Sequence, residues 1–160
     1  MTVAAFVGLG SNLDDPATQV ATAAEELRGL SAGHFALSPL YASKAVGPGE
    51  QPDYVNAVAQ LETGDAPLAL LHSLQQIEQR HGRVRTQRWG ARTLDLDLLL
   101  YGDLTLSHRD LTLPHPRIAE RAFVLAPLHD LAPDVEIPGI GRPAALLTDA
   151  MRRQVWMAHG

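Results

Sequence analysis

Thr93-Leu94-Asp95-Leu96-Asp97-Leu98-Leu99-Leu100-Tyr101 is an apolar run that contains two aspartates and is followed by Gly102. A run of this length with a turn residue at its end predicts a largely buried strand. Five further patterns precede it: strands at 3–9, 35–42 and 54–61, and amphipathic helices that begin near residues 16 and 67. We expect an aspartate at 14–15 to cap the first helix and Gly82 to end the second.

The order strand, helix, strand, strand, helix, strand is that of a ferredoxin-like βαββαβ unit. The fold class is therefore α+β, with a mostly antiparallel sheet. C-terminal additions are expected: a short strand near 111, a short helix near 118, a helix at 122–131, a strand at 135–137 and a helix at 143–151. The segment 8–12, Gly-Leu-Gly-Ser-Asn, lacks the spacing of a dinucleotide or P-loop motif and is expected to form a tight turn.

Length and composition limit the possible functions. The 160 residues predict one domain covering 1–160, and the absence of cysteine excludes disulfides and thiolate metal sites. No signal peptide or membrane-spanning run is evident, so a cytoplasmic protein is expected. The net charge of −5 argues against nucleic acid as a partner, whereas five of the 13 Lys and Arg residues fall within positions 80–92. This cluster suggests a local anion site.

Asp95 and Asp97 are the first candidate site residues. Side chains two apart on a strand share a face, so both carboxylates project together, with backbones about 7 Å apart. Such a pair suits Mg²⁺, which takes few carboxylates and keeps phosphate and water ligands. The competing interpretation is two ordinary aspartates on a solvated face. The arginine cluster before the strand favours the metal site, because phosphate transfer needs charge neutralisation.

Other candidates are less distinctive on their own. Arginines of the cluster could bind phosphate or simply be solvated, and Trp89 within it could cover a nucleotide. His115, fixed between two prolines, could face a phosphate or be an ordinary turn residue. Tyr54, Asn56 and Phe123 could enclose a flat heterocycle or pack in the core.

The chain resembles the 6-hydroxymethyl-7,8-dihydropterin pyrophosphokinases of folate biosynthesis over about residues 1–140. The resemblance rests on several motifs in order: Gly-Leu-Gly-Ser-Asn-Leu at 8–13, Gln-Pro-Asp-Tyr-Val-Asn-Ala at 51–57, Gly-Arg-Val-Arg at 82–85, Arg-Trp-Gly at 88–90, Arg-Thr-Leu-Asp-Leu-Asp at 92–97 and Leu-Pro-His at 113–115. It implies transfer of the β,γ-pyrophosphoryl group of ATP to the pterin hydroxymethyl oxygen, with release of AMP.

The resemblance also implies a role for each matching residue. Two Mg²⁺ ions would be held by Asp95 and Asp97. The catalytic set would comprise Arg83, Arg92, Asp95 and Asp97. Pterin would contact Ser43, Val46, Tyr54, Asn56 and Phe123. ATP would contact Gln75, Glu78, Arg85, Arg88, Trp89, Arg92, Leu98, His115 and Arg121. The family expectation is a monomer that binds small molecules and neither nucleic acid nor membrane.

The chain departs from the family pattern in places. Ser43-Lys44-Ala45-Val46 replaces a more proline-rich loop, the arginine segment is about one residue shorter, and Asp110 stands where some members have a nucleotide-contacting arginine, so no role is carried over to it. Two alternative functions remain open at this point: a metal-dependent phosphohydrolase using the same Asp pair, and a non-catalytic ferredoxin-like nucleotide-binding module.

Overall fold

The computed structural model describes residues 1–13, 15–45, 52–82 and 94–158. An antiparallel sheet runs through the molecule in the order β5-β1-β4-β3-β8. Strand β2 also pairs with β4, at residues 59–61, whereas β3 pairs with residues 54–56 of β4. The strands are β1 (Val3–Ser11), β2 (Phe35–Leu37), β3 (Tyr41–Ser43), β4 (Tyr54–Thr63), β5 (Asp95–Tyr101) and β8 (Val155–Met157). The ferredoxin-like α+β prediction is confirmed.

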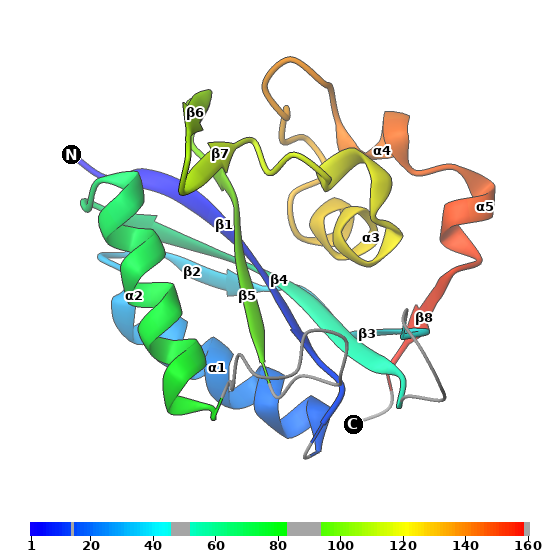
Figure 1. The fold of residues 1–160 in the computed structure, drawn as a ribbon. Coiled ribbons are helices and arrows are strands. Elements are labelled where there is room, and N and C mark those ends of the chain that lie inside the picture. The colour runs from blue at the N-terminus through cyan, green and yellow to red at the C-terminus, as the bar shows by residue number, and fades with distance from the viewer. Residues whose placement is uncertain (14, 46–51, 83–93, 159–160) are drawn as a thin grey trace.

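Helices cover both faces of this sheet (Figure 1). Helices α1 (Pro16–Leu30) and α2 (Pro67–Arg80) lie on one face, and α3 (Ala122–Leu131) lies on the other with the short helices α4 (Pro143–Leu146) and α5 (Asp149–Arg152). A small hairpin of β6 (Leu106–His108) and β7 (Leu111–Leu113) leads into a 3₁₀ turn, η1 (Ile118–Glu120). The C-terminal additions thus form the second helical layer.

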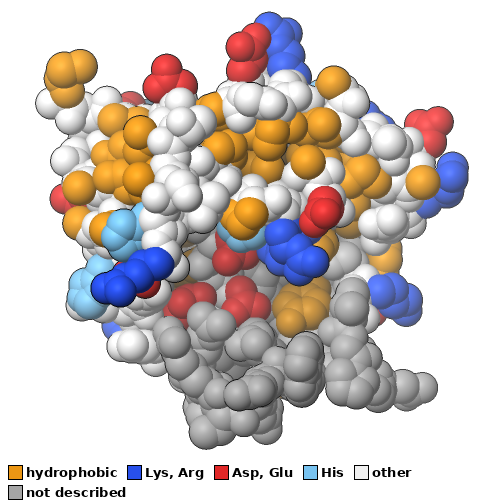
Figure 2. Space-filling model, turned by 45° about the horizontal axis from the view of Figure 1, so that its top comes forward, with side chains coloured by type: hydrophobic (Ala, Val, Ile, Leu, Met, Phe, Trp, Pro, Cys, Tyr) orange, Lys and Arg blue, Asp and Glu red, His pale blue; other side chains and the backbone are white. Residues whose placement is uncertain are grey.

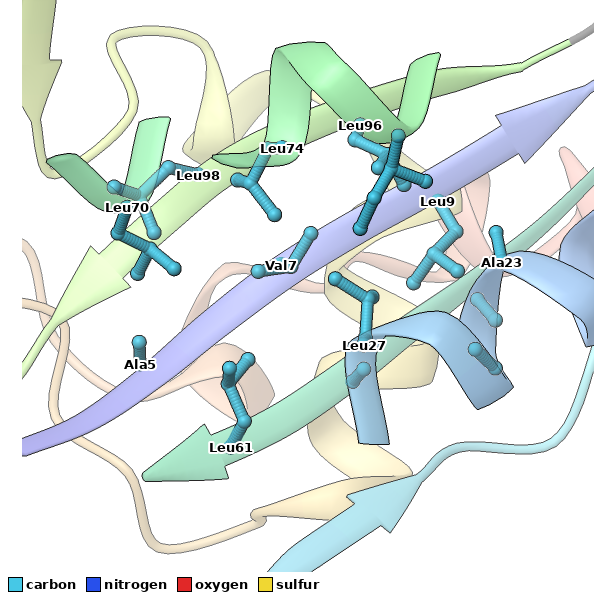
Figure 3. Packing of buried hydrophobic residues seen from close by; sticks show 14 of the residues in the cluster. Ala5, Val7, Leu9, Ala23, Leu27, Leu61, Leu70, Leu74, Leu96 and Leu98 are labelled. Carbon is cyan, nitrogen blue, oxygen red and sulfur yellow. The ribbon is translucent and has the colours of Figure 1, made fainter. Parts of the chain in front are cut away.

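The hydrophobic core divides between the two faces because strand side chains alternate. Ala5, Val7 and Leu9 of β1 pack with α1 and α2, whereas Phe6 packs on the α3 side. Figure 3 shows the first of these clusters, in which Leu27 of α1 and Leu74 of α2 face the central strand. The strand predicted at 54–61 alternates in the same way, with Ala57, Ala59 and Leu61 on the α1 and α2 side and Val58 on the α3 side.

Several predicted boundaries are wrong, each for a local reason. The strand expected at 35–42 is broken between β2 and β3, because Pro39 has no N–H for the ladder. Ser38 still connects this segment to β4, because its Oγ accepts a hydrogen bond from the backbone N–H of Val58 over 2.9 Å. Residues 8 and 10 lie inside β1 and not in a tight turn.

Other differences concern helix ends and the C-terminal segment. Asp15 precedes α1 with φ 59° and makes no capping hydrogen bond through its side chain. Gly82 does follow α2 with a positive φ of 77°, as predicted. Residues 135–137 contribute only a bridge from Ile137 to Gly141, and the helix expected at 143–151 is divided into α4 and α5 by Leu147 and Thr148. Strand β8 was not predicted.

Candidate active site

A pocket of about 230 Å³ opens on the α3 side of the sheet. Three of its walls come from separate parts of the chain: β4 with the end of β3, the start of β5, and the start of α3. Its lining residues are Gly8, Leu9, Gly10, Ser43, Lys44, Tyr54, Asn56, Ala57, Asp95, Asp97, Arg121, Phe123 and Val124. The structure therefore brings together the predicted metal pair and four of the predicted pterin residues.

The floor of the pocket is the backbone of β1, the central strand. Gly8 pairs with Asp97, and Gly10 pairs with both Asp95 and Asn56 on the two neighbouring strands. A methyl group at Gly10 would lie 3.2 Å from Asn56 Oδ1, so glycine keeps this space open. Sequence analysis missed the floor, although two glycines at strand spacing opposite polar residues signal a close approach to backbone.

Asn56 is the central polar group of the β4 wall. The residue is 3% exposed, and its Nδ2 donates a hydrogen bond to Ser43 Oγ over 2.8 Å. Its Oδ1 is turned towards Gly10. Tyr54 stands two residues away on the same face, and Phe123 approaches from the start of α3. The β4 and α3 walls together therefore combine two aromatic rings with one fixed amide.

Asp95 and Asp97 form the acidic side of the same pocket, as the strand alternation predicts. The Asp97 side chain is 43% exposed, and its Oδ2 lies 3.6 Å from Nη1 of Arg121. The Arg121 guanidinium also lies 5.5 Å from the centre of the Phe123 ring. In Figure 2, acidic side chains lie at the base of a hollow, beside basic and histidine side chains.

These residues fit a hard divalent cation. The two carboxylates supply oxygen ligands, share one face and are open to the pocket, so water and phosphate oxygens could complete an octahedral shell. Within the described part of the chain, no group of three or more His, Asp or Glu side chains comes together. A pair of carboxylates matches the few protein ligands that Mg²⁺ takes where phosphate is also bound.

His115 lies beside Asp97 in an adjoining cavity of about 250 Å³. Its backbone N–H donates to the carbonyl of Leu99 over 2.9 Å, and its Nδ1 accepts from the N–H of Arg117 over 3.2 Å. Burial lowers the pKa of His115 below its ordinary value, while the Asp97 carboxylate acts to raise it. The cavity is lined by Leu71, Leu96, Asp97, Leu98, Arg109, Asp110, Leu111, Thr112, His115 and Pro116.

The remaining predicted residues are placed differently. Gln75 is half-buried on α2, and Glu78 on the same helix is 4% exposed, with its carboxylate against the backbone of β5. Val46, Arg83, Arg85, Arg88, Trp89 and Arg92 lie outside the described residues, and their roles stay predictions. Lys44, which lines the pocket with its Nζ 3.7 Å from Asp53 Oδ1, had not been predicted as a site residue.

The model of the family "7,8-dihydro-6-hydroxymethylpterin-pyrophosphokinase (HPPK)" matches residues 6–133. The chain belongs to this family. It is 48% identical over 137 residues to the 2-amino-4-hydroxy-6-hydroxymethyldihydropteridine pyrophosphokinase of Haemophilus influenzae, covering 85% of this chain and 86% of that protein. It is 51% identical over 134 residues to the Pseudomonas aeruginosa protein of the same name, covering 83% of each. The family resemblance seen in the sequence is thus confirmed.

Solved structures of the family support the fold. The chain aligns with a crystal structure of Plasmodium falciparum HPPK-DHPS with pteroate at a TM-score of 0.71 and 15% identity. The match covers 96% of this chain and 43% of that longer chain. None of the helices in the described residues is both long enough and apolar enough to cross a membrane.

Proposed function

We propose that this chain transfers the β,γ-pyrophosphoryl group of ATP to the hydroxymethyl oxygen of 6-hydroxymethyl-7,8-dihydropterin, yielding the pterin diphosphate and AMP in folate biosynthesis. Membership of the pyrophosphokinase family supports this activity. The observation that carries it is one pocket lined by Tyr54, Asn56 and Phe123 on one side and by Asp95 and Asp97 on the other. A heterocycle bound by the first group would present its substituent to the second.

The pterin would bind on the β4 side. Its flat ring would stack against Tyr54 and Phe123 over the glycine floor, and Asn56 would read its hydrogen-bonding edge. Ser43 holds the Asn56 amide in place, so the amide would meet the ring in a fixed orientation. Val46 is proposed to complete this side from outside the described residues.

The metal would bind between the pterin and the nucleotide. We propose Asp95 and Asp97 as the protein ligands of two Mg²⁺ ions, which would neutralise phosphate charge and polarise the transferred group. Arg121 approaches Asp97 from the start of α3, so it would meet the same phosphates and add positive charge at the opposite wall. Both carboxylates are partly exposed on one strand face, which supports this assignment.

ATP would occupy the cavity beyond Asp97. Leu98 and His115 line that cavity, which supports their assignment to the nucleotide site. Gln75 and Glu78 are proposed from the family pattern to assist ATP binding, Glu78 indirectly through the backbone of β5, to which its buried carboxylate is bonded. The Nδ1 of His115 accepts a hydrogen bond from the backbone N–H of Arg117, so a neutral His115 would carry its proton on Nε2. This Nε2–H would donate a hydrogen bond to a phosphate oxygen. Arg83, Arg85, Arg88, Trp89 and Arg92 are proposed to contact ATP or to assist catalysis from outside the described residues.

The reaction would be an in-line displacement. The pterin hydroxymethyl oxygen forms a bond to the β-phosphorus, the bond from that phosphorus to the α,β-bridging oxygen breaks, and AMP leaves with the bridging oxygen. The hydroxyl proton is released to solvent. The protein's own residues contribute mainly by positioning the two substrates and excluding water, since phosphate transfer depends on alignment and charge neutralisation.

The deciding experiment mixes the protein with ATP, Mg²⁺ and the hydroxymethyl pterin and measures AMP. Release of AMP that requires the pterin, with formation of pterin diphosphate, is the expected result. AMP release without pterin would instead identify a phosphohydrolase, and nucleotide binding without turnover would identify a binding module. We also propose a single domain and a monomer in the cytoplasm, which sedimentation and cell fractionation can check.

A further inference from the structure

A buried carboxylate holds the strand that carries the two aspartates. Glu78, in the last turn of α2, accepts a hydrogen bond from the backbone N–H of Leu96 over 2.9 Å. Leu96 is the residue between Asp95 and Asp97. The bond therefore joins α2 to β5 at the midpoint of the proposed metal-binding pair.

The position of Glu78 within its helix is unusual for an acidic residue. The other buried residues of α2 are Leu70, Leu74 and Ile77, so Glu78 falls on the core-facing side of the helix. A carboxylate that is only 4% exposed is strongly disfavoured unless polar groups satisfy it. A leucine at this position would continue the apolar face of the helix, so packing alone does not explain the glutamate.

The geometry of β5 explains why an acceptor is useful there. Among the described strands, β5 pairs with β1 on one side and forms the edge of the sheet on the other. Successive N–H groups of such a strand point alternately towards its partner and away from it. With Asp95 and Asp97 in register with Gly10 and Gly8, the N–H of Leu96 points to the open edge, where Glu78 receives it.

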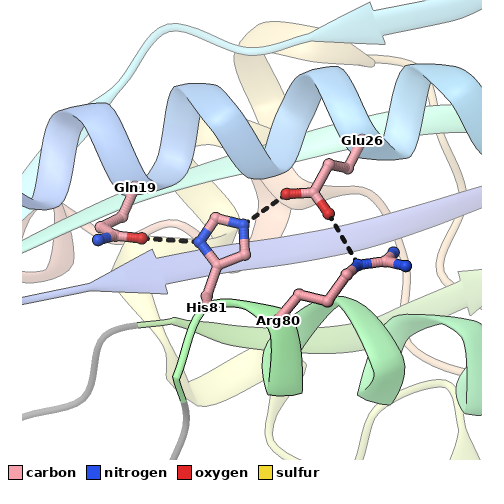
Figure 4. A network of polar contacts seen from close by, with 4 residues as sticks. All are labelled: Gln19, Glu26, Arg80 and His81. Carbon is pink, nitrogen blue, oxygen red and sulfur yellow. Dashed lines mark hydrogen bonds and ion pairs between the residues drawn. The ribbon is translucent and has the colours of Figure 1, made fainter.

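The helix end that carries Glu78 is itself held in place. His81, which follows α2, has Nδ1 2.7 Å from Gln19 Oε1 and Nε2 2.5 Å from Glu26 Oε1, both on α1 (Figure 4). Arg80 adds an ion pair, with Nε 3.4 Å from Glu26 Oε2. These contacts with α1 hold the C-terminal end of α2 in place, and with it the position of the Glu78 carboxylate relative to β5.

We propose that Glu78 is a positioning residue for the metal site: through the Leu96 N–H it fixes the backbone from which Asp95 and Asp97 reach the cation. This role rests on the proposed function of the two aspartates and adds to it. Residues that orient metal ligands typically change metal affinity or activity about 10- to 100-fold when removed. A similar effect is expected here although Glu78 does not touch the metal.

The test compares Glu78→Leu, which keeps the bulk and removes the acceptor, with Glu78→Gln, whose amide oxygen can still accept the Leu96 N–H. Mn²⁺ binding in the presence of α,β-methylene ATP is measured by electron paramagnetic resonance, and hydrogen exchange of the Leu96 amide by NMR. Glu78→Leu should weaken Mn²⁺ binding about tenfold or more and speed exchange at Leu96. Glu78→Gln should stay within about threefold of the wild type.

Ser38→Ala provides the matched control, because Ser38 Oγ also anchors a buried backbone N–H, that of Val58, on another strand. It should lower the melting temperature without changing Mn²⁺ affinity. Should Glu78→Leu fail to fold, Glu78→Asp, whose shorter side chain withdraws the carboxylate from Leu96, takes its place with the same expected loss. Wild-type Mn²⁺ affinity in whichever of these two variants folds would overturn the proposal.

Asp97→Asn separates this proposal from the proposed function. Loss of Mn²⁺ binding in Asp97→Asn, with wild-type binding in Glu78→Leu, would leave the metal site standing and remove only the positioning role. Wild-type Mn²⁺ binding in Asp97→Asn would instead overturn the metal assignment itself. The Leu96 exchange rate reports on the Glu78 bond in either case.

Discussion

Asn56 donates a hydrogen bond from Nδ2 to Ser43 Oγ over 2.8 Å, joining the middle of the β4 wall to the end of β3. Both residues are at least nine-tenths buried, and both line the proposed pterin pocket. The hydroxyl occupies one side of the amide, and the amide oxygen faces the floor over Gly10. The orientation of the group that would recognise the pterin is therefore set by the protein before any ligand binds.

Removing this amide should impair pterin binding more than ATP binding. Asn56→Ala should weaken binding of the hydroxymethyl pterin about 10- to 100-fold, because a buried hydrogen-bonding partner of the ring is lost. Ser43→Ala should weaken it about two- to tenfold by releasing the amide. Calorimetric titration of the two single variants and the double variant gives the coupling. Strictly additive effects would contradict the proposed orienting role of Ser43.

The floor of the pocket provides a second test with its own control. Gly10→Ala should raise the pterin KM about tenfold, because the new Cβ lies 3.2 Å from Asn56 Oδ1 and must displace the amide. Gly8→Ala adds the same methyl group to the same strand face but meets Leu99 at an ordinary 3.5 Å. Its effect on the pterin KM should be smaller. Steady-state kinetics would give the pterin KM of both variants. A larger increase in Gly8→Ala than in Gly10→Ala would contradict the proposed role of the Gly10 backbone as the floor of the pterin pocket.

Substitution within the pair Asp95 and Asp97 should abolish turnover without unfolding the protein. Asp97→Asn should reduce AMP formation at least about 100-fold at saturating ATP and pterin, because the cation loses a charged ligand. Its melting temperature should stay close to that of the wild type, since the Asp97 side chain is 43% exposed. Asp134→Asn, at an aspartate that is 90% exposed and paired with Arg142, is the control. Turnover at the wild-type rate in Asp97→Asn would sink the assignment.

Tyr41 predicts a change of stability at alkaline pH. Burial, together with a hydrogen bond from its hydroxyl to Asp130, raises the pKa of Tyr41 from 10.0 to about 12. The neutral phenol is thus favoured in the folded state, so its contribution is fully present below pH 10 and is lost as pH rises towards about 12. Urea denaturation between these pH values should show a steeper decline for the wild type than for Tyr41→Phe. Parallel declines in the two proteins would argue against the raised pKa.

The contact between α1 and α2 should be measurable as stability. Glu26→Gln should lower the free energy of unfolding by about 1 kcal/mol, because the Glu26 carboxylate is hydrogen-bonded to His81 and forms an ion pair with Arg80. Glu25→Gln alters the neighbouring glutamate, which is 70% exposed and forms an ion pair with Arg28 on the same helix. This substitution should change the free energy of unfolding by less than about 0.5 kcal/mol. Denaturant titration of both variants compares them directly. Equal effects would mean that the contact with α2 adds nothing.

The sequence was informative wherever one local pattern determined the result. Alternation placed Asp95 and Asp97 on one face of β5, where both line the pocket. It failed where a single residue interrupted a pattern. Pro39 broke one predicted strand, and the pairing of β8 with β3 depends on a contact between distant parts of the chain that no local pattern records.

The site was predictable as a set of residues but not as a geometry. Nothing local indicates that Glu78 would face the backbone of Leu96, because its position in α2 reads as part of an amphipathic helix. The role of Gly10 was likewise not predicted, since it depends on Asn56, the residue paired with Gly10 on the neighbouring strand β4. Both features depend on the packing of elements that are far apart in the sequence.

The bare backbone of β1 has a consequence for inhibitors. A compound that competes with the pterin would rest on main-chain atoms at Gly8 and Gly10, which substitution cannot remove. Resistance at the floor would require an added side chain, and at Gly10 that side chain would crowd Asn56, the residue proposed to recognise the substrate. Compounds that draw their affinity from the floor should therefore be harder to escape by mutation than compounds that depend on rim residues such as Lys44.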